Sequence, residues 1–516
     1  MASTTANTAA AAAEWLQSNG VPQLMDSLTA RLVAERPGDV VEFLIKELQQ
    51  LSRYSPAAQR CAAKMRSAGA HELHIRAFLQ NHETVAAGST GTIPEADIVP
   101  AADLPYLERL TVSARPELIK QTVVLKLNGG LGTGMGLSKA KSLLPVKGDK
   151  TFLDYIALQV LSFRDEFKSD VRFMLMDSFS TSDDTKAYLA KYPAFAGDKF
   201  ATEVEVMQGK TPKVAQATLT PAEYPEAPEN EWCPPGHGEL YCSLESSGKL
   251  NALLRDGFKY MFVSNSDNLG ATLDLGLLTY LADEGHDFLM EVCERTESDK
   301  KGGHLARSKA TGGLLLRESA QCAKEDEAAF QDVSKHRYFN TNNLWINLRV
   351  LAEILAERSG VLGLPLIRNE KPVDPAKPST PRVFQLETAM GAALAVIDGA
   401  HALRVPRSRF VPVKKNSDLL VLMSDAYDLR EDFGLQLAAD RTGAPPVVTL
   451  DDRYYLLYDA MTARFPHGAP SLRRCDALTV KGDVVFGRDI VVEGRVVVEN
   501  DGDGALRLAD GSRLRA

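Results

Sequence analysis

TVVLKLNGGLGTGMG, residues 122–136, joins a short aliphatic run to a glycine-rich segment, and this junction decides the fold. Two further aliphatic runs, VRFMLMD at 171–177 and YMFVSNSDNLG at 260–270, also lead into polar segments, and helix-like stretches lie between the three. Buried strands that alternate with helices are typical of a largely parallel sheet in an α/β protein. Such sheets bind ligands at the carboxyl ends of their strands, so we expect a site after these runs.

The loop after the first run has five glycines within eight residues: Gly129, Gly130, Gly132, Gly134 and Gly136. Glycine lets backbone N–H groups surround a polyphosphate, because no Cβ blocks the approach and a positive φ costs little. The loop fails the Walker pattern, and it fails the dinucleotide fingerprint because Met135 stands where the third glycine of GxGxxG would fall. P-loop and hydride-transfer chemistry are therefore disfavoured.

Three lysines follow this loop, at Lys139, Lys141 and Lys147. Displacement at a phosphorus atom builds negative charge on its oxygens and on the leaving group, and a fixed ammonium stabilises that charge. Lysines after a glycine-rich turn are more often solvated helix residues. The glycines and lysines together nevertheless favour a phosphate site.

Two polar loops could complete this site. Asp267, at the end of the third run, would suit Mg²⁺ held together with phosphate oxygens, although an aspartate that caps the next helix is an equally ordinary interpretation. His237 lies in the turn PPGHG at 234–238, which could present it to a phosphate or a base. Taken alone, His237 is an ordinary loop histidine.

Two other segments are unusual for plain structure. FNTNNLW at 339–345 concentrates amide groups beside aromatic residues, which suits sugar hydroxyls. VPRSRFVPVK at 405–414 holds three cations, which suits phosphate. Either segment is equally compatible with a structural loop.

The N-terminal region predicts two short helices over 15–51. Leucines recur in the first helix, a second apolar stripe follows, and RPGD at 36–39 forms the turn, with Asp39 as a cap. About forty residues cannot bury two stripes alone, so we expect pairing with another copy or another helix; packing on the main body is the alternative. Residues 56–82 predict further helix, interrupted at Gly69.

The C-terminal region has a different period. Leu478, Val484, Ile490 and Val496 are six residues apart, with glycines near the corners. This spacing favours a parallel β-helix built from hexapeptide repeats, and a meander of hairpins is the alternative. We therefore expect a flexible lead at 1–14, a helical pair at 15–54, a helical part at 55–120, a core at 121–425 and a C-terminal domain at 426–516.

Composition excludes several classes of protein. A chain of 516 residues with 44% hydrophobic residues should fold into two or three domains. Its net charge of −9 argues against nucleic acid as the main partner. The six cysteines have no metal-ligand spacing, no apolar run is long enough to span a membrane, and the first residues make a poor secretory signal. We expect reduced thiols and a cytoplasmic protein.

Eight segments in one order resemble the eukaryotic UTP–glucose-1-phosphate uridylyltransferase (UDP-glucose pyrophosphorylase) family, especially its short protozoan form. They are LNGGLGTGMG (127–136), FMLMDSF (173–179), PPGHG (234–238), MFVSNSDNLGAT (261–272), RTESDKKGGHLAR (295–307), FNTNNLW (339–345), QLETAMGAA (385–393) and VPRSRFVPVK (405–414). The resemblance runs from about residue 55 to 500. It implies an α/β fold, with a Rossmann-like nucleotide-diphospho-sugar transferase core, a C-terminal parallel β-helix and an N-terminal helical pair.

The resemblance also implies roles for residues, with UTP and glucose 1-phosphate as substrates and Mg²⁺ as cofactor. Lys141 and Lys414 would act on the phosphates from opposite sides of the cleft, and Asp267 would bind the metal. The implied nucleotide-binding residues are Leu127, Asn128, Gly129, Gly130, Gly132, Gly134, Gly136, Gln208, Gly236, His237, Asn265 and Asp267. Among these, Gln208 and Gly236 would face the uracil. The implied sugar-binding residues are Gly302, Asn340, Asn342 and Glu387. Ser266 replaces the glycine usual in the family, which puts the metal geometry beside Asp267 in doubt.

Residues 15–51 lie outside that resemblance. Their RPGDVVEFL core is similar to the docking-and-dimerisation domain of the type II regulatory subunit of cyclic-AMP-dependent protein kinase. This similarity implies a homodimer that binds an amphipathic helix of a scaffold, in a cilium or flagellum. Two alternatives stay open: a uridylyltransferase for other sugar 1-phosphates, and a structural ciliary protein that acts mainly through this domain.

Overall fold

The computed structural model describes residues 21–441 and 443–515. Its largest sheet has ten strands, and four parallel strands form the part that carries the site, in the order β10-β2-β5-β6. They are β2 (Thr122–Leu127), β5 (Arg172–Asp177), β6 (Glu205–Met207) and β10 (Tyr260–Asn265). The three aliphatic runs of the sequence are thus parallel strands, as predicted, and the structure places them next to one another.

The remaining strands make this sheet mixed. β14 (Tyr338–Asn347) pairs antiparallel with β10 and with β11 (Phe288–Glu294), and β11 pairs parallel with β17 (Ala400–Arg404). The far edge is formed by antiparallel strands: β1 (Ile98–Pro100), β12 (His304–Ser308) and β13 (Leu314–Arg317). The parallel part expected from the sequence is therefore present at the centre, and antiparallel strands extend it into a mixed sheet.

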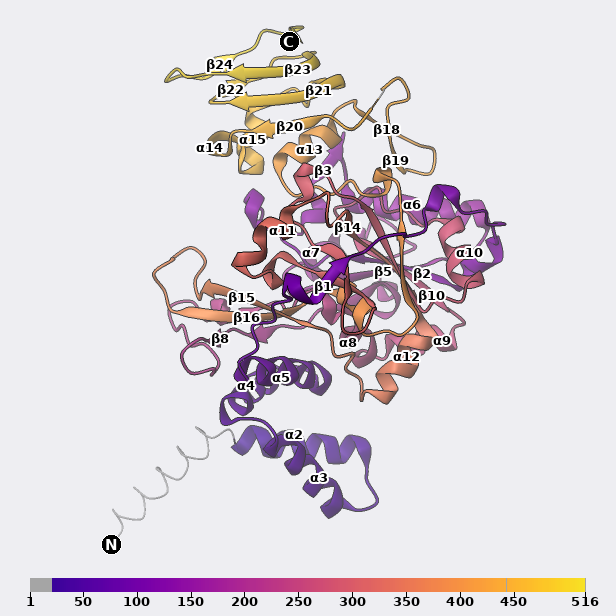
Figure 1. Ribbon diagram of the computed structural model, residues 1–516, viewed down its shortest axis with the longest axis vertical. Helices are drawn as coiled ribbons and strands as arrows, with labels where there is room; N and C mark the ends of the chain where they lie inside the picture. The colour runs from indigo at the N-terminus through magenta and orange to yellow at the C-terminus, as the bar shows by residue number, and fades with distance from the viewer. Residues whose placement is uncertain (1–20, 442, 516) are drawn as a thin grey trace.

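Helices cover both faces of the sheet (Figure 1). Val124 of β2 packs in one buried cluster with α6 (Phe152–Phe167) and α10 (Leu275–Asp283). Its neighbours Val123 and Leu125 pack in the opposite cluster, which includes α8 (Leu240–Ser246), α9 (Lys249–Arg255) and α12 (Leu348–Glu357). Because successive strand side chains point to opposite faces, burial on both faces explains why these strands are continuously aliphatic.

Four helices precede the sheet: α2 (Val21–Glu35), α3 (Val40–Ser52), α4 (Pro56–Ser67) and α5 (Glu72–Ala86). Asp39 caps α3, since its Oδ1 accepts the N–H of Glu42 at 2.9 Å, and Gly69 separates α4 from α5 with φ +77°. The helices α4 and α5 pack on the body through a cluster that includes Val214 and Leu386. In Figure 1, α2 and α3 lie beyond α4 and α5, at the opposite end from the C-terminal strands. Residues 15–20 of the predicted pair, and the lead at 1–14, lie outside the described residues.

The C-terminal strands pair in parallel. One sheet has the order β20-β21-β23-β25, and a second joins β22 to β24. Their bounds are β20 (Val447–Leu450), β21 (Ser471–Lys481), β22 (Val484–Val485), β23 (Val491–Glu499), β24 (Leu506–Arg507) and β25 (Arg513–Arg515). Consecutive hairpins would give antiparallel pairs, so the alternative of a meander is wrong. The periodic residues Leu478, Val484, Ile490 and Val496 are all buried.

Shorter elements complete the chain. They are β3 (Pro145–Lys147), β4 (Lys150–Thr151), α7 (Ser182–Leu189), β7 (Thr211–Pro212), β8 (Val214–Ala215), β9 (Trp232–Cys233), α11 (Glu327–Gln331), β15 (Leu366–Pro372), β16 (Arg382–Thr388), α13 (Asn416–Met423), β18 (Tyr427–Leu429), β19 (Leu435–Leu437), α14 (Asp452–Tyr455) and α15 (Tyr458–Arg464). No helix among residues 21–441 and 443–515 is both long and apolar enough to cross a membrane.

Candidate active site

The strand β2 lies at the centre of the large sheet and ends at Leu127. The glycine-rich loop begins there, with Asn128. Gly132 and Gly136 have φ of +65° and +76°, a left-handed conformation that glycine adopts without strain. The N–H of Lys141 donates to the carbonyl of Gly130 at 3.0 Å and closes the loop. This bond holds Lys141 against the loop, where it begins a short 3₁₀ turn, Lys141–Leu143.

Lys141, after the glycine loop, and Asp267, after β10, form an ion pair. The Lys141 Nζ lies 2.6 Å from Asp267 Oδ2, and it also donates to the carbonyl of Val413. Both side chains are partly exposed, at 17% and 19%. Asp267 is therefore engaged with a cation rather than capping a helix, so the capping interpretation does not hold.

The other two lysines of the sequence pattern lie elsewhere. Lys147 Nζ donates to the carbonyl of Ser424 at 2.7 Å, and burial lowers the pKa of this lysine. Lys139 is exposed on the outer side of the loop, in a pocket it shares with residues 457–460. Of the three lysines, only Lys141 reaches Asp267.

Gln208 connects the glycine loop to the PPGHG turn. Its Oε1 lies so close to Gly129 that a Cβ at this position would come within 2.9 Å of it. Its Nε2 donates to the carbonyl of Gly236 at 3.0 Å. Gly236 has φ +82°, and a Cβ there would lie 2.4 Å from the carbonyl oxygen of Thr388. Glycine is thus required at Gly236, where the close atom is backbone, whereas at Gly129 the close atom is the end of a flexible side chain.

His237 has a defined protonation pattern. Its Nδ1 accepts the N–H of Met390 at 3.0 Å, so a neutral ring carries its proton on Nε2. Burial lowers the pKa of His237 to about 4, which keeps the ring neutral near pH 7. Nε2 can therefore donate a hydrogen bond without contributing charge.

A buried carboxyl group supports the start of the loop. Asn128 Nδ2 donates to Asp177 Oδ1 at 2.7 Å and to Thr185 Oγ1 at 2.9 Å, and Ser178 Oγ donates to the carbonyl of Gly129 at 2.9 Å. Burial raises the pKa of Asp177 to about 7. The Asn128 side chain thus bonds to buried groups that support the loop, and it does not face outward.

Three of the four predicted sugar residues, Gly302, Asn340 and Asn342, lie around Phe339. A Cβ on Gly302 would come within 2.1 Å of the Phe339 ring, so the chain packs flat on that ring. Asn340 Nδ2 donates to Asn342 Oδ1 at 2.9 Å, and Asn342 has φ +58°. Glu387 lies apart from them, beside Gly236, and accepts a hydrogen bond from Asn369 at 3.0 Å.

Glu318 belongs to this cluster, although the sequence did not single it out. Its carboxylate lies against Gly303, hydrogen bonds to Asn340 and faces the charge of Lys414. Burial raises the pKa of Glu318. The surrounding sequence, LLLRESAQ, does not indicate that Glu318 belongs to this cluster, because its neighbours come from other segments of the chain.

Only one of the three cations at 405–414 remains available for a ligand. Arg409 is buried and forms an ion pair with Glu291, and Arg407 pairs with Asp299 at 2.6 Å. Lys414 is exposed, with its Nζ 5.5 Å from the centre of the Phe339 ring. For both arginines the structural interpretation is the correct one, while Lys414 keeps the phosphate interpretation.

Asn265 ends β10, partly exposed, two residues before Asp267. The carboxyl ends of β2, β6 and β10, the turn at 236–238 and the Phe339 cluster thus carry most of the predicted residues, and Glu387 lies on β16. A profile of the family described as UTP–glucose-1-phosphate uridylyltransferase matches residues 71–493. The chain belongs to this family. The prediction of an enzyme, a nucleotidyltransferase of this family, is confirmed.

Several relatives of the family resemble the chain over most of its length. The UTP–glucose-1-phosphate uridylyltransferase of Saccharomyces cerevisiae is 38% identical over 411 residues, which are 78% of this chain and 79% of that protein. The barley enzyme, from Hordeum vulgare, is 37% identical and covers 78% and 82%.

Solved structures of this family superimpose closely on the chain. A Leishmania major UDP-glucose pyrophosphorylase variant in complex with UDP-glucose is 51% identical with a TM-score of 0.85, covering 90% of this chain and 98% of that one. The Trypanosoma brucei UDP-glucose phosphorylase is 50% identical with a TM-score of 0.84, covering 89% and 98%. The family resemblance inferred from the eight motifs is therefore confirmed.

Proposed function

We propose that this member of the family joins UTP and glucose 1-phosphate to give UDP-glucose and pyrophosphate. An oxygen of the sugar phosphate attacks the α-phosphorus in line, a new P–O bond forms, and the bond to the bridging oxygen of the β-phosphate breaks. Pyrophosphate leaves with the electron pair of that bond. No covalent enzyme intermediate is needed, so positioning and electrostatic stabilisation provide the catalysis.

The contact between Lys141 and Asp267 carries this proposal. The ammonium lies at the open side of the glycine loop and is already in place for charge that develops on the phosphates. Lys414, on the side of Phe339, would neutralise charge from the opposite direction. Gln208 and Gly236 would face the uracil, His237 Nε2 would donate to a phosphate oxygen, and the asparagines at 340 and 342 would contact the hexose.

Asp267 would hold Mg²⁺. No group of three or more histidine, cysteine, aspartate or glutamate side chains that could bind a metal exists among the described residues. Magnesium is usually held by one or two carboxylates together with substrate phosphates and water, so a single partly exposed carboxylate fits. When bound, the ion would supply positive charge that offsets the negative charge of the phosphates. Lys141 would then exchange its contact with Asp267 for the phosphates.

Sugar specificity is the first test. We expect pyrophosphate release with glucose 1-phosphate to exceed release with galactose or N-acetylglucosamine 1-phosphate by at least about tenfold in kcat/KM. One unmatched polar group in a hydrogen-bonding pocket already costs this much. The measurement is a panel of sugar 1-phosphates with UTP. Equal rates across the panel would instead favour the alternative of a broad uridylyltransferase.

We also propose that α2 and α3 form a dimerisation and docking domain. Side chains that the amphipathic pattern of α3 assigns to its apolar stripe are exposed: Val41 at 66%, Ile45 at 50% and Leu48 at 45%. Met25 and Val33 of α2 are exposed at 55% and 66%. Two amphipathic helices that leave this much apolar surface open favour association with a second copy. A scaffold located at a cilium would then tether this protein at the cilium, in the cytoplasm.

Removal of residues 1–54 tests this second proposal. We expect the full chain to elute as a dimer and the shortened chain as a monomer in light-scattering chromatography, with kcat changed by less than about twofold because the active site is untouched. A fluorescent amphipathic helix that binds type II docking domains should bind only the full chain. A full chain that is monomeric and binds no such helix would contradict the docking role.

A last proposal concerns the C-terminal strands. We infer that they form a short parallel β-helix, which the parallel pairing of β21 with β23 and of β22 with β24 supports. The six-residue period would then describe successive faces of one coil.

A further inference from the structure

Glu239 joins the two segments of the proposed base site. It lies two residues after His237 in a 3₁₀ turn and is only 7% exposed. Its Oε2 accepts the N–H of Gly209, the residue after Gln208, at 3.0 Å. One carboxylate thus links the end of β6, which carries Gln208, to the turn that carries Gly236.

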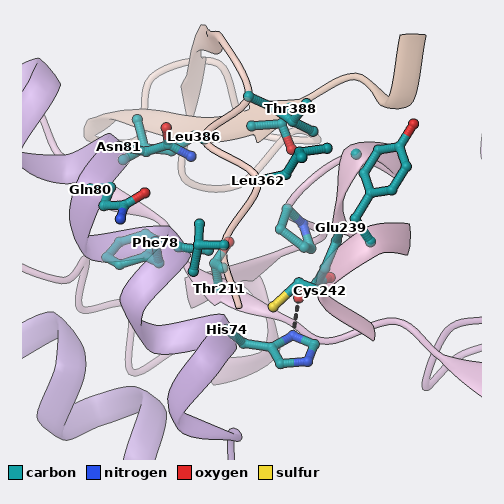
Figure 2. A pocket seen from close by; sticks show the side chains of 17 residues that line it. His74, Phe78, Gln80, Asn81, Thr211, Glu239, Cys242, Leu362, Leu386 and Thr388 are labelled. Atoms are coloured by element: carbon teal, nitrogen blue, oxygen red, sulfur yellow. Dashed lines mark hydrogen bonds and ion pairs between the residues drawn. The ribbon is translucent and has the colours of Figure 1, made fainter. Parts of the chain in front are cut away.

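The other oxygen of this carboxylate is held from outside the sheet. Glu239 Oε1 contacts Nδ1 of His74, which belongs to the N-terminal helix α5, and His74 Nε2 is 2.8 Å from Ser246 Oγ. Figure 2 shows His74 extending from α5 to this contact at the edge of a pocket that is also lined by Phe78 and Thr388. Both ring nitrogens of His74 are thus fixed, so the ring has one orientation.

Gly209 fits tightly against this pair. A Cβ on Gly209 would lie 2.8 Å from Glu239 Oε1 and 2.9 Å from His74 Nδ1. The N–H of Gln208 donates to the carbonyl of Asp177 at 2.7 Å, and its side chain donates to Gly236. The segment at 208–209 is therefore held on one side by β5 and on the other by Glu239.

We propose that Glu239 and His74 are positioning residues that hold Gln208 and the turn at 236–238 in register for the nucleotide base. Helix α5, which precedes the sheet in the sequence, thereby takes part in nucleotide recognition. The inference rests on the proposed function, because Gln208 is taken to face the uracil. It assigns a role to residues that neither the family motifs nor the glycine loop indicate.

Steady-state kinetics of the full chain test the proposal. Glu239→Ala removes the contacts with Gly209 and His74, and His74→Ala removes the second of these, so the KM for UTP should rise about tenfold in His74→Ala and at least as much in Glu239→Ala. We expect kcat to stay within about threefold and the KM for glucose 1-phosphate to stay unchanged. Glu239→Gln keeps an oxygen for Gly209 and an amide for His74, so it should restore a KM within about twofold of the unmodified enzyme.

Two further variants separate the possible outcomes. His82→Gln alters another buried histidine of α5, which bonds to the carbonyl of Leu219, and should leave the KM for UTP unchanged. Gln208→Ala should raise the KM for UTP; if it does not, the base assignment itself is wrong. If Gln208→Ala raises the KM while His74→Ala and Glu239→Ala do not, the positioning role alone is overturned.

A purely structural role is also distinguishable. It would lower kcat or the melting temperature equally in His74→Ala and His82→Gln, without a specific change in the KM for UTP, and this result would overturn the proposal. If Glu239→Ala fails to fold, His74→Ala and Glu239→Gln still decide. In the double variant His74→Ala/Glu239→Ala, the KM should rise no further than in Glu239→Ala alone, because that single change already removes the contact with His74.

Discussion

Lys141→Ala is expected to lower kcat by about 10³-fold, because a fixed cation beside a transferring phosphoryl group stabilises charge that exists mainly in the transition state. The change should leave the fold intact. Lys141 is partly exposed, and its partner Asp267 at 2.6 Å is also open to water and can be solvated when left alone. The measurement is pyrophosphate release by the purified variant, with its far-ultraviolet circular dichroism and melting temperature recorded in parallel.

Lys139→Ala is the matched control for this variant. Lys139 follows the same glycine loop but is exposed on its outer side, so we expect kcat within about twofold of the unmodified enzyme. Equal losses in both variants would indicate a general effect of charge near the loop. Near-normal turnover of Lys141→Ala would reject its role in catalysis.

The sequence best predicted those features of the candidate site that one local segment encodes. Five glycines in eight residues, after an aliphatic run, predicted a glycine-rich loop at the end of β2, and the structure has this loop there. Gly132 and Gly136 adopt positive φ, a local backbone requirement that a single segment can reveal. The predicted role of Gln208 depended instead on family resemblance, because no local pattern marks a lone glutamine. The cations at 405–414 did form a local pattern, but only the resemblance singled out Lys414 among them.

Contacts between residues that are distant in sequence could not be predicted from the sequence. The sequence alone did not distinguish the roles of the three cations at 405–414. In the structure, Arg407 pairs with Asp299 and Arg409 with Glu291, each more than 100 positions away. The sequence does not show which cation will meet a carboxylate on folding. The same limit hid Glu318 and the contact between His74 and Glu239, which joins residues 165 positions apart.

Glu291 and Arg409 form a buried ion pair that should determine stability rather than substrate binding. Glu291 is fully buried and accepts four hydrogen bonds: two from Arg409, both at 2.7 Å, one from Asn343 at 3.0 Å and one from Trp345 at 2.8 Å. Removing the guanidinium would leave a buried carboxylate without its counter-ion, a change that typically costs about 3–5 kcal/mol.

Arg409→Met is therefore expected to lower the midpoint of urea unfolding strongly, while the KM for UTP and for glucose 1-phosphate stays within about threefold for the folded fraction. Lys414→Met gives the opposite expectation: its exposed ammonium contributes little to stability, so the unfolding midpoint should hold while turnover falls. Both variants replace a cation with methionine within one ten-residue segment, so the comparison separates a structural cation from a phosphate ligand. An Arg409→Met protein of normal stability with a greatly raised KM would show that Arg409 contacts phosphate after all, and that the pair with Glu291 opens when substrate binds.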